Sequence, residues 1–266
     1  MKTTLTVLVI LELYGLSSGL IKQHFFVNEE KPWVFALQHC RTFFHDLSTF
    51  TTESEEQQFL EDAVGQTSDA WVGLYKISGV WKWAGGENAT QTSWDTKQPE
   101  DDECAFLHKG HKKLHDFKCM DKNAFFCMNI SEFVLVQQKE SWEGALEYCR
   151  KHYDDLASLS SENRLISALG KITQADTGYV WTGLRFLAGE WLWVNGDDLD
   201  FTAWSQTGPP QCPARNLRCG ALDKQTRVWT HRYCGEKLNF FCSVHIVHGM
   251  SYGQAASPIL QIANTN

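Results

Sequence analysis

The sequence predicts an α+β protein in which one disulfide-linked domain occurs twice. Two observations indicate a duplication. Cysteines spaced 15 and 8 residues apart recur with the same spacings, first as Cys104, Cys119 and Cys127 and then as Cys219, Cys234 and Cys242. Four tryptophans recur at a constant distance of 110 residues, Trp71, Trp81, Trp83 and Trp94 reappearing as Trp181, Trp191, Trp193 and Trp204. Solenoid repeats have periods of about 20–50 residues, so this longer repeat is a whole domain. Within each copy, helical patterns precede strand patterns, which is typical of the α+β class.

The two ends of the chain differ from the repeats. Residues 1–19 resemble a secretion signal, with Lys2, a mostly apolar run over 5–16 and small residues at 17–19. That run is shorter than the roughly 20 apolar residues of a membrane span, and no later stretch is long enough. We therefore expect a secreted, extracellular protein with no membrane span. Residues 245–266 are neither apolar nor periodic and are expected to form a disordered tail.

The first copy is expected over residues 24–128 and the second over 133–244, joined by a short linker at 129–132. Each copy begins with a short strand, 25–27 in the first and 133–136 in the second. A helix follows, because apolar residues recur at helical spacing. Its apolar face is formed by Trp33, Ala36, Leu37, Cys40 and Phe44 in the first copy, and by Trp142, Ala145, Leu146, Cys149 and Tyr153 in the second.

A second helix is predicted over 53–64, where Thr52 and Glu55 have the spacing of a capping box. The matching helix of the second copy is expected at 162–172. Strands and turns follow, beginning with a Trp-x-Gly-Leu segment at 71–74 and a Trp-x-Trp segment at 81–83. We expect these tryptophans to lie in the core, since they recur at fixed strand positions. A long irregular stretch then leads to two short strands near the last cysteines.

These combined motifs resemble the C-type lectin-like domain, twice over nearly the whole mature chain. The resemblance implies two helices, short antiparallel sheets and a long loop in each domain. It also implies four disulfides: Cys40–Cys127, Cys104–Cys119, Cys149–Cys242 and Cys219–Cys234. Closing a loop of about 90 residues contributes several kcal/mol in the chain-entropy model.

Composition excludes several functions. Nine cysteines in a secreted chain indicate disulfides, and the sequons at Asn88 and Asn129 predict glycosylation. The net charge of −8 and the lack of a basic stripe argue against nucleic acid as a partner. No Ser-His-Asp or Cys-His arrangement is visible, so we expect no enzyme activity.

The long loop of the first copy carries the candidate site. In the family that the chain resembles, this loop and the next strand hold a calcium ion that binds sugar, and Gln-Pro-Asp is the galactose-type signature. Here the loop reads Gln98-Pro99-Glu100, an arrangement that leans towards galactose. The resemblance implies calcium ligands at Gln98, Glu100, Asp102 and Asp116, with His115 where the family has Asn. Oxygen ligands suit calcium, whereas imidazole does not. The alternative is a solvated acidic loop, because residues 100–103 are all acidic.

Three histidines near this loop raise a second metal hypothesis. In a helix, His111 and His115 would share one face and could bind zinc. Gly110 and the strand expected at 114–117 argue against that helix and favour a solvated turn containing His108.

The second copy lacks the acidic ligands. Its loop, residues 204–219, contains no carboxylate, and neither does the strand at 228–231. We therefore expect no calcium there. This loop is five residues longer than its partner and contains Cys212, the ninth cysteine. An odd cysteine in a secreted protein suggests an intermolecular disulfide, here a dimer, or a free thiol.

The resemblance thus implies a secreted lectin that binds glycans or glycoproteins, with calcium in the first domain only and a role in innate immune recognition. The alternative is a calcium-independent protein-binding module, since lectin-like domains with degraded loops often bind proteins.

Overall fold

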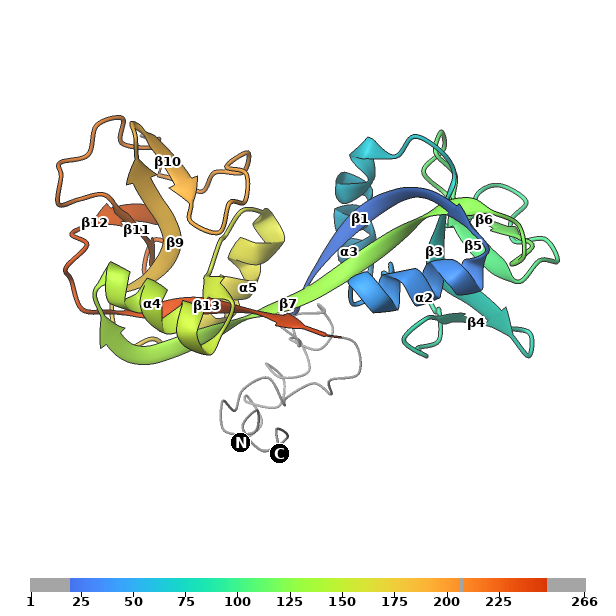
Figure 1. Cartoon of the computed structure of the whole chain (residues 1–266), viewed down its shortest axis with the longest axis horizontal. Coiled ribbons are helices and arrows are strands. Elements are labelled where there is room, and N and C mark those ends of the chain that lie inside the picture. The colour runs from blue at the N-terminus through green and yellow to red at the C-terminus, as the bar shows by residue number, and fades with distance from the viewer. Residues whose placement is uncertain (1–19, 206–207, 248–266) are drawn as a thin grey trace, which may run out of the picture. The chain divides into compact units, whose positions relative to one another are not determined.

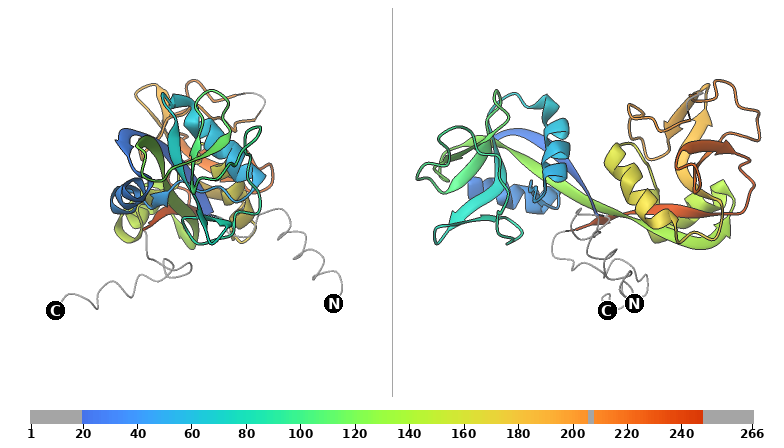
Figure 2. Two further views of the ribbon diagram at one scale, coloured as in Figure 1. Left: turned by 90° about the vertical axis from the view of Figure 1, so that its right-hand side faces the viewer. Right: turned by 180° about the vertical axis from the view of Figure 1, so that it is seen from behind.

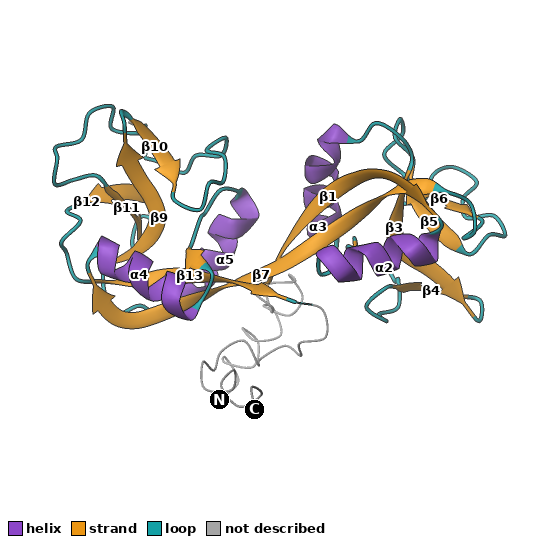
Figure 3. Cartoon of the chain, in the orientation of Figure 1, coloured by secondary structure: helices purple, strands orange, loops and turns teal. Residues whose placement is uncertain are grey.

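A computed structural model describes residues 20–205 and 208–247 of the chain. The predicted signal peptide at 1–19 and residues 248–266 of the predicted tail lie outside the described residues. The chain divides into two compact units, whose main segments are Lys22–Ile130 and Ser131–His245. Each unit is α+β and contains two α-helices, drawn in purple in Figure 3.

The elements of the first unit follow the predicted order of helices and then strands. They are β1 (Leu20–Lys31), α2 (Trp33–Phe43), β2 (Asp46–Leu47), α3 (Glu53–Asp62), the 3-10 turn η1 (Ala63–Gly65), β3 (Ala70–Ile77), β4 (Val80–Trp83), β5 (Cys104–Leu107), β6 (Leu114–Phe117) and β7 (Asn123–Glu140). Strands β1 and β7 pair and lie side by side (Figures 1 and 2).

The second unit repeats this order after β7. Its elements are α4 (Trp142–His152), β8 (Asp155–Leu156), α5 (Glu162–Ile172), β9 (Tyr179–Leu187), β10 (Glu190–Trp193), β11 (Cys219–Asp223), β12 (Trp229–Arg232) and β13 (Leu238–Ile246).

Strand pairing is the same in both units. In the first, β3 is antiparallel to β4 and β5, and β5 is antiparallel to β6. In the second, β9 is antiparallel to β10 and β11, and β11 to β12. The expected short antiparallel pairings are joined by one parallel pairing in each unit, since β3 runs parallel to β7 and β9 runs parallel to β13. These parallel pairs arise because the last strand enters beside the Trp-x-Gly-Leu strand after a long crossover.

Two predicted boundaries fall within strands. The linker expected at 129–132 lies inside β7, which is continuous from Asn123 to Glu140. Strand β13 continues to Ile246, so it includes the first two residues of the expected tail. Strand β7 pairs with β1, β2, β3 and β13, which accounts for its length.

The repeated tryptophans form the cores. Trp71 and Trp83 of the first unit, and Trp181 and Trp193 of the second, are fully buried. Trp71 Nε1 donates to the carbonyl of Lys31 at 2.9 Å, and Trp181 Nε1 donates to that of Glu140 at 2.9 Å. The indoles of Trp71 and Trp181 thus bury their rings while their only donors are satisfied.

Four disulfides close the two units. Cys40–Cys127 and Cys149–Cys242 tie the first helix of each unit to its last strand, across 87 and 93 residues. Cys104–Cys119 and Cys219–Cys234 each span 15 residues. These pairs agree with those that the family resemblance implies. Cys212 is a free, exposed cysteine.

Candidate functional site

The candidate loop of the first unit is held against the start of β6. The segment before it forms a parallel bridge between Trp94 and Leu114, and the Asp95 N–H donates to the Leu114 carbonyl at 3.0 Å. Just after this bridge, the Gln98–Pro99 peptide bond is cis. The loop then returns to β5 at Cys104, so residues 98–103 lie next to β6.

Asp116 is the residue on which this loop closes. Its side chain is buried, and its two carboxylate oxygens each accept one backbone N–H from the loop, Oδ1 from Glu100 at 2.8 Å and Oδ2 from Asp102 at 2.9 Å. Gln98 Oε1 in turn accepts the N–H of Asp116 at 3.0 Å. The structure thus brings four of the five predicted site residues together. In the acidic loop, Asp116 contacts the backbone N–H groups of Glu100 and Asp102.

The acidic side chains themselves do not gather around one point. Among the residues that the structure describes, the groups in which three His, Cys, Asp or Glu ligand atoms lie within 4.8 Å of one another do not include Glu100, Asp102 or Asp116. Glu100 is exposed and Asp102 half-buried. A calcium ion at this loop would therefore require these side chains to turn towards Gln98 and Asp116.

His115, the fifth predicted residue, lies elsewhere. Successive residues of a strand point to opposite faces, so His115 is directed away from the side of β6 on which Asp116 holds the loop. Its Nε2 lies 2.9 Å from Asp95 Oδ2, and its ring stacks on Phe106 with centroids 5.4 Å apart. His115 is thus placed with Asp95, away from Gln98 and Glu100.

Sequence reasoning missed Asp95. The same Oδ2 atom also lies 2.6 Å from His111 Nδ1. Hydrogen bonds from His111, the Thr96 N–H and His115 hold the pKa of the Asp95 carboxyl far below its usual value. No local pattern could have revealed this group, because His111 and His115 are 16 and 20 residues from Asp95 and meet it only through the bridge beside β6.

The second unit has different side chains at the equivalent positions. Its parallel bridge joins Trp204 to Trp229, so strand register places Thr230 and His231 where the first unit has His115 and Asp116. Pro210 contributes its carbonyl to Trp191 Nε1 at 3.0 Å. The described residues of this loop and of β12 contain no carboxylate.

A second group of potential metal ligands can be set aside. Glu143, Cys219 and Cys234 also lie within 4.8 Å of one another, but these cysteines form a disulfide and have no thiolate to offer. Among the described residues, no helix is long and apolar enough to cross a membrane.

Comparison with known protein families agrees with this geometry. The family model for the Lectin C-type domain matches twice, over residues 29–129 and 138–244. Together these matches cover most of the chain, which therefore belongs to the C-type lectin domain family.

Several curated relatives are larger proteins. C-type mannose receptor 2 of Mus musculus is 20% identical over 261 residues, which is 81% of this chain and 18% of the receptor. Secretory phospholipase A2 receptor of Bos taurus is 27% identical over 119 residues, 43% of this chain and 8% of the receptor. The chain thus spans less than a fifth of the length of these relatives.

Similar single domains also occur. C-type lectin lectoxin-Phi1 of Philodryas olfersii is 24% identical over 127 residues, 45% of this chain and 81% of the lectoxin. Among solved structures, the carbohydrate-recognition domain of a mouse scavenger receptor C-type lectin is 25% identical. The matched region is 40% of this chain and 88% of the scavenger receptor domain, with a TM-score of 0.37.

Proposed function

We propose that this chain is a secreted carbohydrate-binding lectin and not an enzyme. Its first domain binds a terminal sugar with a galactose preference through calcium, and its second domain has no calcium site. Its partners are glycans or glycoproteins, as expected for innate immune recognition. The observation that carries the proposal is that Gln98, Glu100 and Asp102 are held beside Asp116, whose N–H donates to Gln98 Oε1 at 3.0 Å.

The ligand set is chemically suited to calcium. Calcium takes about 6–8 oxygen ligands, and Gln98, Glu100, Asp102 and Asp116 supply side-chain oxygens from the loop and β6. Each Asp116 carboxylate oxygen already accepts one loop amide, from Glu100 or from Asp102, and keeps one lone pair with which to bind the ion. We therefore expect weak binding, with the ion reorganising the loop.

Calorimetry with calcium, followed by binding to immobilised galactose and mannose with and without chelator, tests this proposal. Glu100→Gln is the sharpest variant, because Glu100 is exposed and the substitution removes only its charge. It should lower calcium affinity at least about tenfold, the cost of losing one charged oxygen ligand. Glu103→Gln removes the same charge from an exposed glutamate of the same loop that is outside the ligand set, and it should have little effect.

Asp116→Ala should abolish the calcium-dependent signal as well. Because Asp116 also closes the loop, its loss should loosen the loop even when calcium is absent. Sugar binding that survives chelator and both Glu100→Gln and Asp116→Ala would contradict the proposed mechanism.

A calcium-independent protein-binding module is the second candidate. Asp116 favours it, because both carboxylate oxygens are already paired with backbone amides and the loop is closed by protein contacts alone. Glycoprotein binding that is unchanged by chelator and by removal of the glycans would establish this candidate.

We also propose that Cys212 links two chains. It is free and exposed on a loop of the second unit, in a chain expected to be secreted into an oxidising compartment. A non-reducing gel should show a dimer that Cys212→Ser converts to monomer. A monomeric wild-type chain with a titratable thiol would exclude the dimer.

For glycosylation, we propose Asn88 as the modified residue. Asn88 is exposed, whereas Asn129 lies within β7 and the Ser131 of its sequon is buried. Asn88→Gln should therefore remove the mass shift seen on enzymatic deglycosylation, and Asn129→Gln should leave it. The reverse result would assign the glycan to Asn129.

A further inference from the structure

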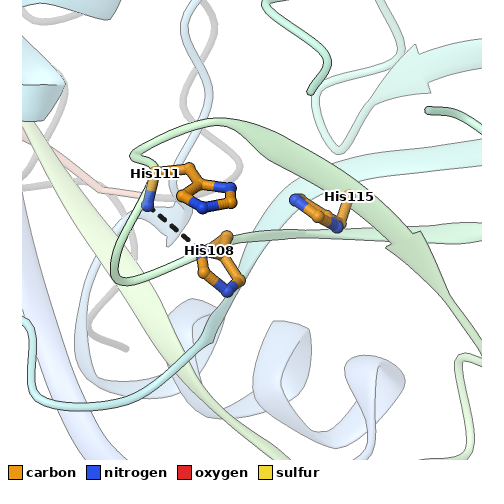
Figure 4. A group of neighbouring side chains, drawn as sticks. All are labelled: His108, His111 and His115. Carbon is orange, nitrogen blue, oxygen red and sulfur yellow. Dashed lines mark hydrogen bonds between the residues drawn. The ribbon is translucent and has the colours of Figure 1, made fainter. Parts of the chain in front are cut away.

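Three histidines of the first unit gather where β5 turns into β6 (Figure 4). His108 follows β5, His111 lies in the turn and His115 is on β6. One ligand nitrogen from each lies within 4.8 Å of those of the other two. The His108 ring is 4.6 Å from that of His111 and 5.1 Å from that of His115, centroid to centroid. The helix that would have brought His111 and His115 together is absent, yet the turn and strand bring them close.

Asp95 fixes the tautomer of two of these rings. Its Oδ2 lies 2.6 Å from His111 Nδ1 and 2.9 Å from His115 Nε2. A carboxylate only accepts hydrogen bonds, so these two nitrogens carry protons. In the neutral rings, His111 Nε2 and His115 Nδ1 therefore hold the free lone pairs. A carboxylate that holds the N–H of a metal-binding histidine is the usual arrangement around protein metal sites.

His108 has a competing role in the turn. Its Nδ1 accepts the backbone N–H groups of Gly110 at 3.2 Å and His111 at 3.1 Å. In the second unit Asp223 does the same, accepting the N–H groups of Gln225 at 2.8 Å and Thr226 at 3.1 Å. His108 is therefore a turn-closing residue as well as a potential ligand, and its engagement by a metal would cost two long hydrogen bonds.

His111, His115 and Asp95 have no such structural explanation. The second unit closes its β11–β12 turn with the sequence Lys224-Gln225-Thr226-Arg227 and has Thr230 at the register position of His115. Ser205 follows its bridge residue Trp204 where Asp95 follows Trp94. The same fold thus forms without these three side chains.

The surroundings also admit a cation. Lys112 lies in the same turn, but its ammonium donates to the Ala63 carbonyl at 3.0 Å and to Gln66 Oε1 at 2.6 Å. The ionised Asp95 carboxylate supplies negative charge beside the rings. His111 is exposed, with 65% of its side-chain surface accessible, so a solvated ion can reach it.

We propose that His111 and His115, which Asp95 orients, bind one Zn²⁺ ion and that His108 is a third ligand. Imidazole nitrogens suit zinc, whereas calcium prefers oxygen. The site is therefore separate from the calcium site proposed at Gln98 and Glu100, and neither proposal depends on the other.

Calorimetric titration of the full secreted chain with Zn²⁺ in chelator-free buffer tests this inference. We expect one bound ion per chain. His111→Ala and His115→Ala should each lower the affinity at least about tenfold, and Asp95→Asn should lower it about 10–100-fold, the usual effect of losing a carboxylate that orients a ligand. His108→Ala should lower the affinity less than either of these variants. The lone pair of His108 Nδ1 is already occupied by two backbone N–H groups of the turn, so His108 is the weaker ligand.

His152→Ala is the matched control, since His152 is an exposed histidine on α4 of the second unit. It should bind zinc like the wild type. If His115→Ala fails to fold, His111→Ala decides the question, because His111 is exposed and its loss leaves the core intact. A wild-type chain that does not bind zinc, or a folded His111→Ala chain that binds with unchanged affinity, would overturn the inference.

Discussion

At the scale of single residues, the two units keep their structural contacts and differ in their chemistry. Arg41 binds both carboxylate oxygens of Asp46 at 3.1 and 3.2 Å, and Arg150 binds those of Asp155 at the same two distances. Asp116, by contrast, has His231 at its register position in the second unit. Side chains that hold the fold were retained, while those facing the loop diverged.

His24 makes the first unit sensitive to acid. Its side chain is buried, its Nδ1 lies 2.9 Å from Ser48 Oγ, and Nε2 has no partner among the described residues. Burial, followed by the nearby charge of Lys22, lowers the pKa of His24 to about 3. At pH values between about 3 and about 6.5, His24 binds a proton in the unfolded chain but not in the folded chain. Stability should therefore fall with pH below about 6.5, by about 1.4 kcal/mol per pH unit.

Urea unfolding at pH 7 and pH 5 checks this prediction. The wild-type chain should lose about 2 kcal/mol through His24 over this range. His24→Asn, which can still bond to Ser48 but does not titrate, should show a smaller loss, whereas His152→Asn should behave as the wild type. An equal loss of stability in His24→Asn would contradict the assignment.

At the scale of elements, local patterns predicted most helices and strands correctly. Helix α5 occupies 162–172 as predicted, and the helix predicted over 53–64 continues past Asp62 as the 3-10 turn η1. Thr52 caps α3 by accepting the Glu55 N–H at 3.2 Å, as half of the expected capping box. The Glu55 carboxylate instead accepts the N–H of Thr51 at 2.7 Å, because it also pairs with Lys22 at 2.9 Å.

The glycine of the Trp-x-Gly-Leu segment is explained by close packing. A Cβ on Gly183 would lie 2.8 Å from the Leu156 carbonyl oxygen, and one on Gly73 would lie 2.9 Å from that of Leu47. Each strand thus passes directly against the backbone that follows the first helix, where the Gly183 N–H donates to Ala157 O at 2.8 Å. A side chain larger than hydrogen does not fit there.

Two glycine substitutions in the second unit should therefore have opposite effects. Gly183→Ala should destabilise the unit by about 1–3 kcal/mol, the usual cost of overpacking. Gly170→Ala in α5 meets no atom within 4 Å and should stabilise it by about 0.5–1 kcal/mol through helix propensity. Thermal unfolding of both variants measures the difference. A Gly183→Ala variant with unchanged stability would show that the two backbone segments can move apart there.

At the scale of the whole molecule, each unit has its own buried core and its own pair of disulfides. Trp71, Trp83 and the aromatic residues around them belong to clusters of the first unit, and Trp181 and Trp193 to clusters of the second. In each unit one bridge closes a long loop and the other a short one.

The long bridges should stabilise more than the short ones. In the chain-entropy model, a loop the length of that closed by Cys40–Cys127 contributes about 4–5 kcal/mol and one the length of that closed by Cys104–Cys119 about 3 kcal/mol. Unfolding of the paired alanine variants Cys40→Ala/Cys127→Ala and Cys104→Ala/Cys119→Ala compares the two. A larger loss on removing the short bridge would show that loop entropy is not the dominant contribution.

The sequence by itself determined the duplicated α+β domains and the tryptophans of the cores, because repeated spacings and helical periodicity are read directly along the chain. The disulfide framework was implied by the resemblance to the C-type lectin-like domain. Only the tertiary structure decided that Asp116 accepts loop amides and that Asp95 joins His111 and His115. These groups come from segments 14 to 20 residues apart, and the register of β6 against its neighbours brings them together. Side-chain direction within that register therefore separates the proposed calcium loop from the cluster of histidines, although Asp116 and His115 are adjacent in sequence.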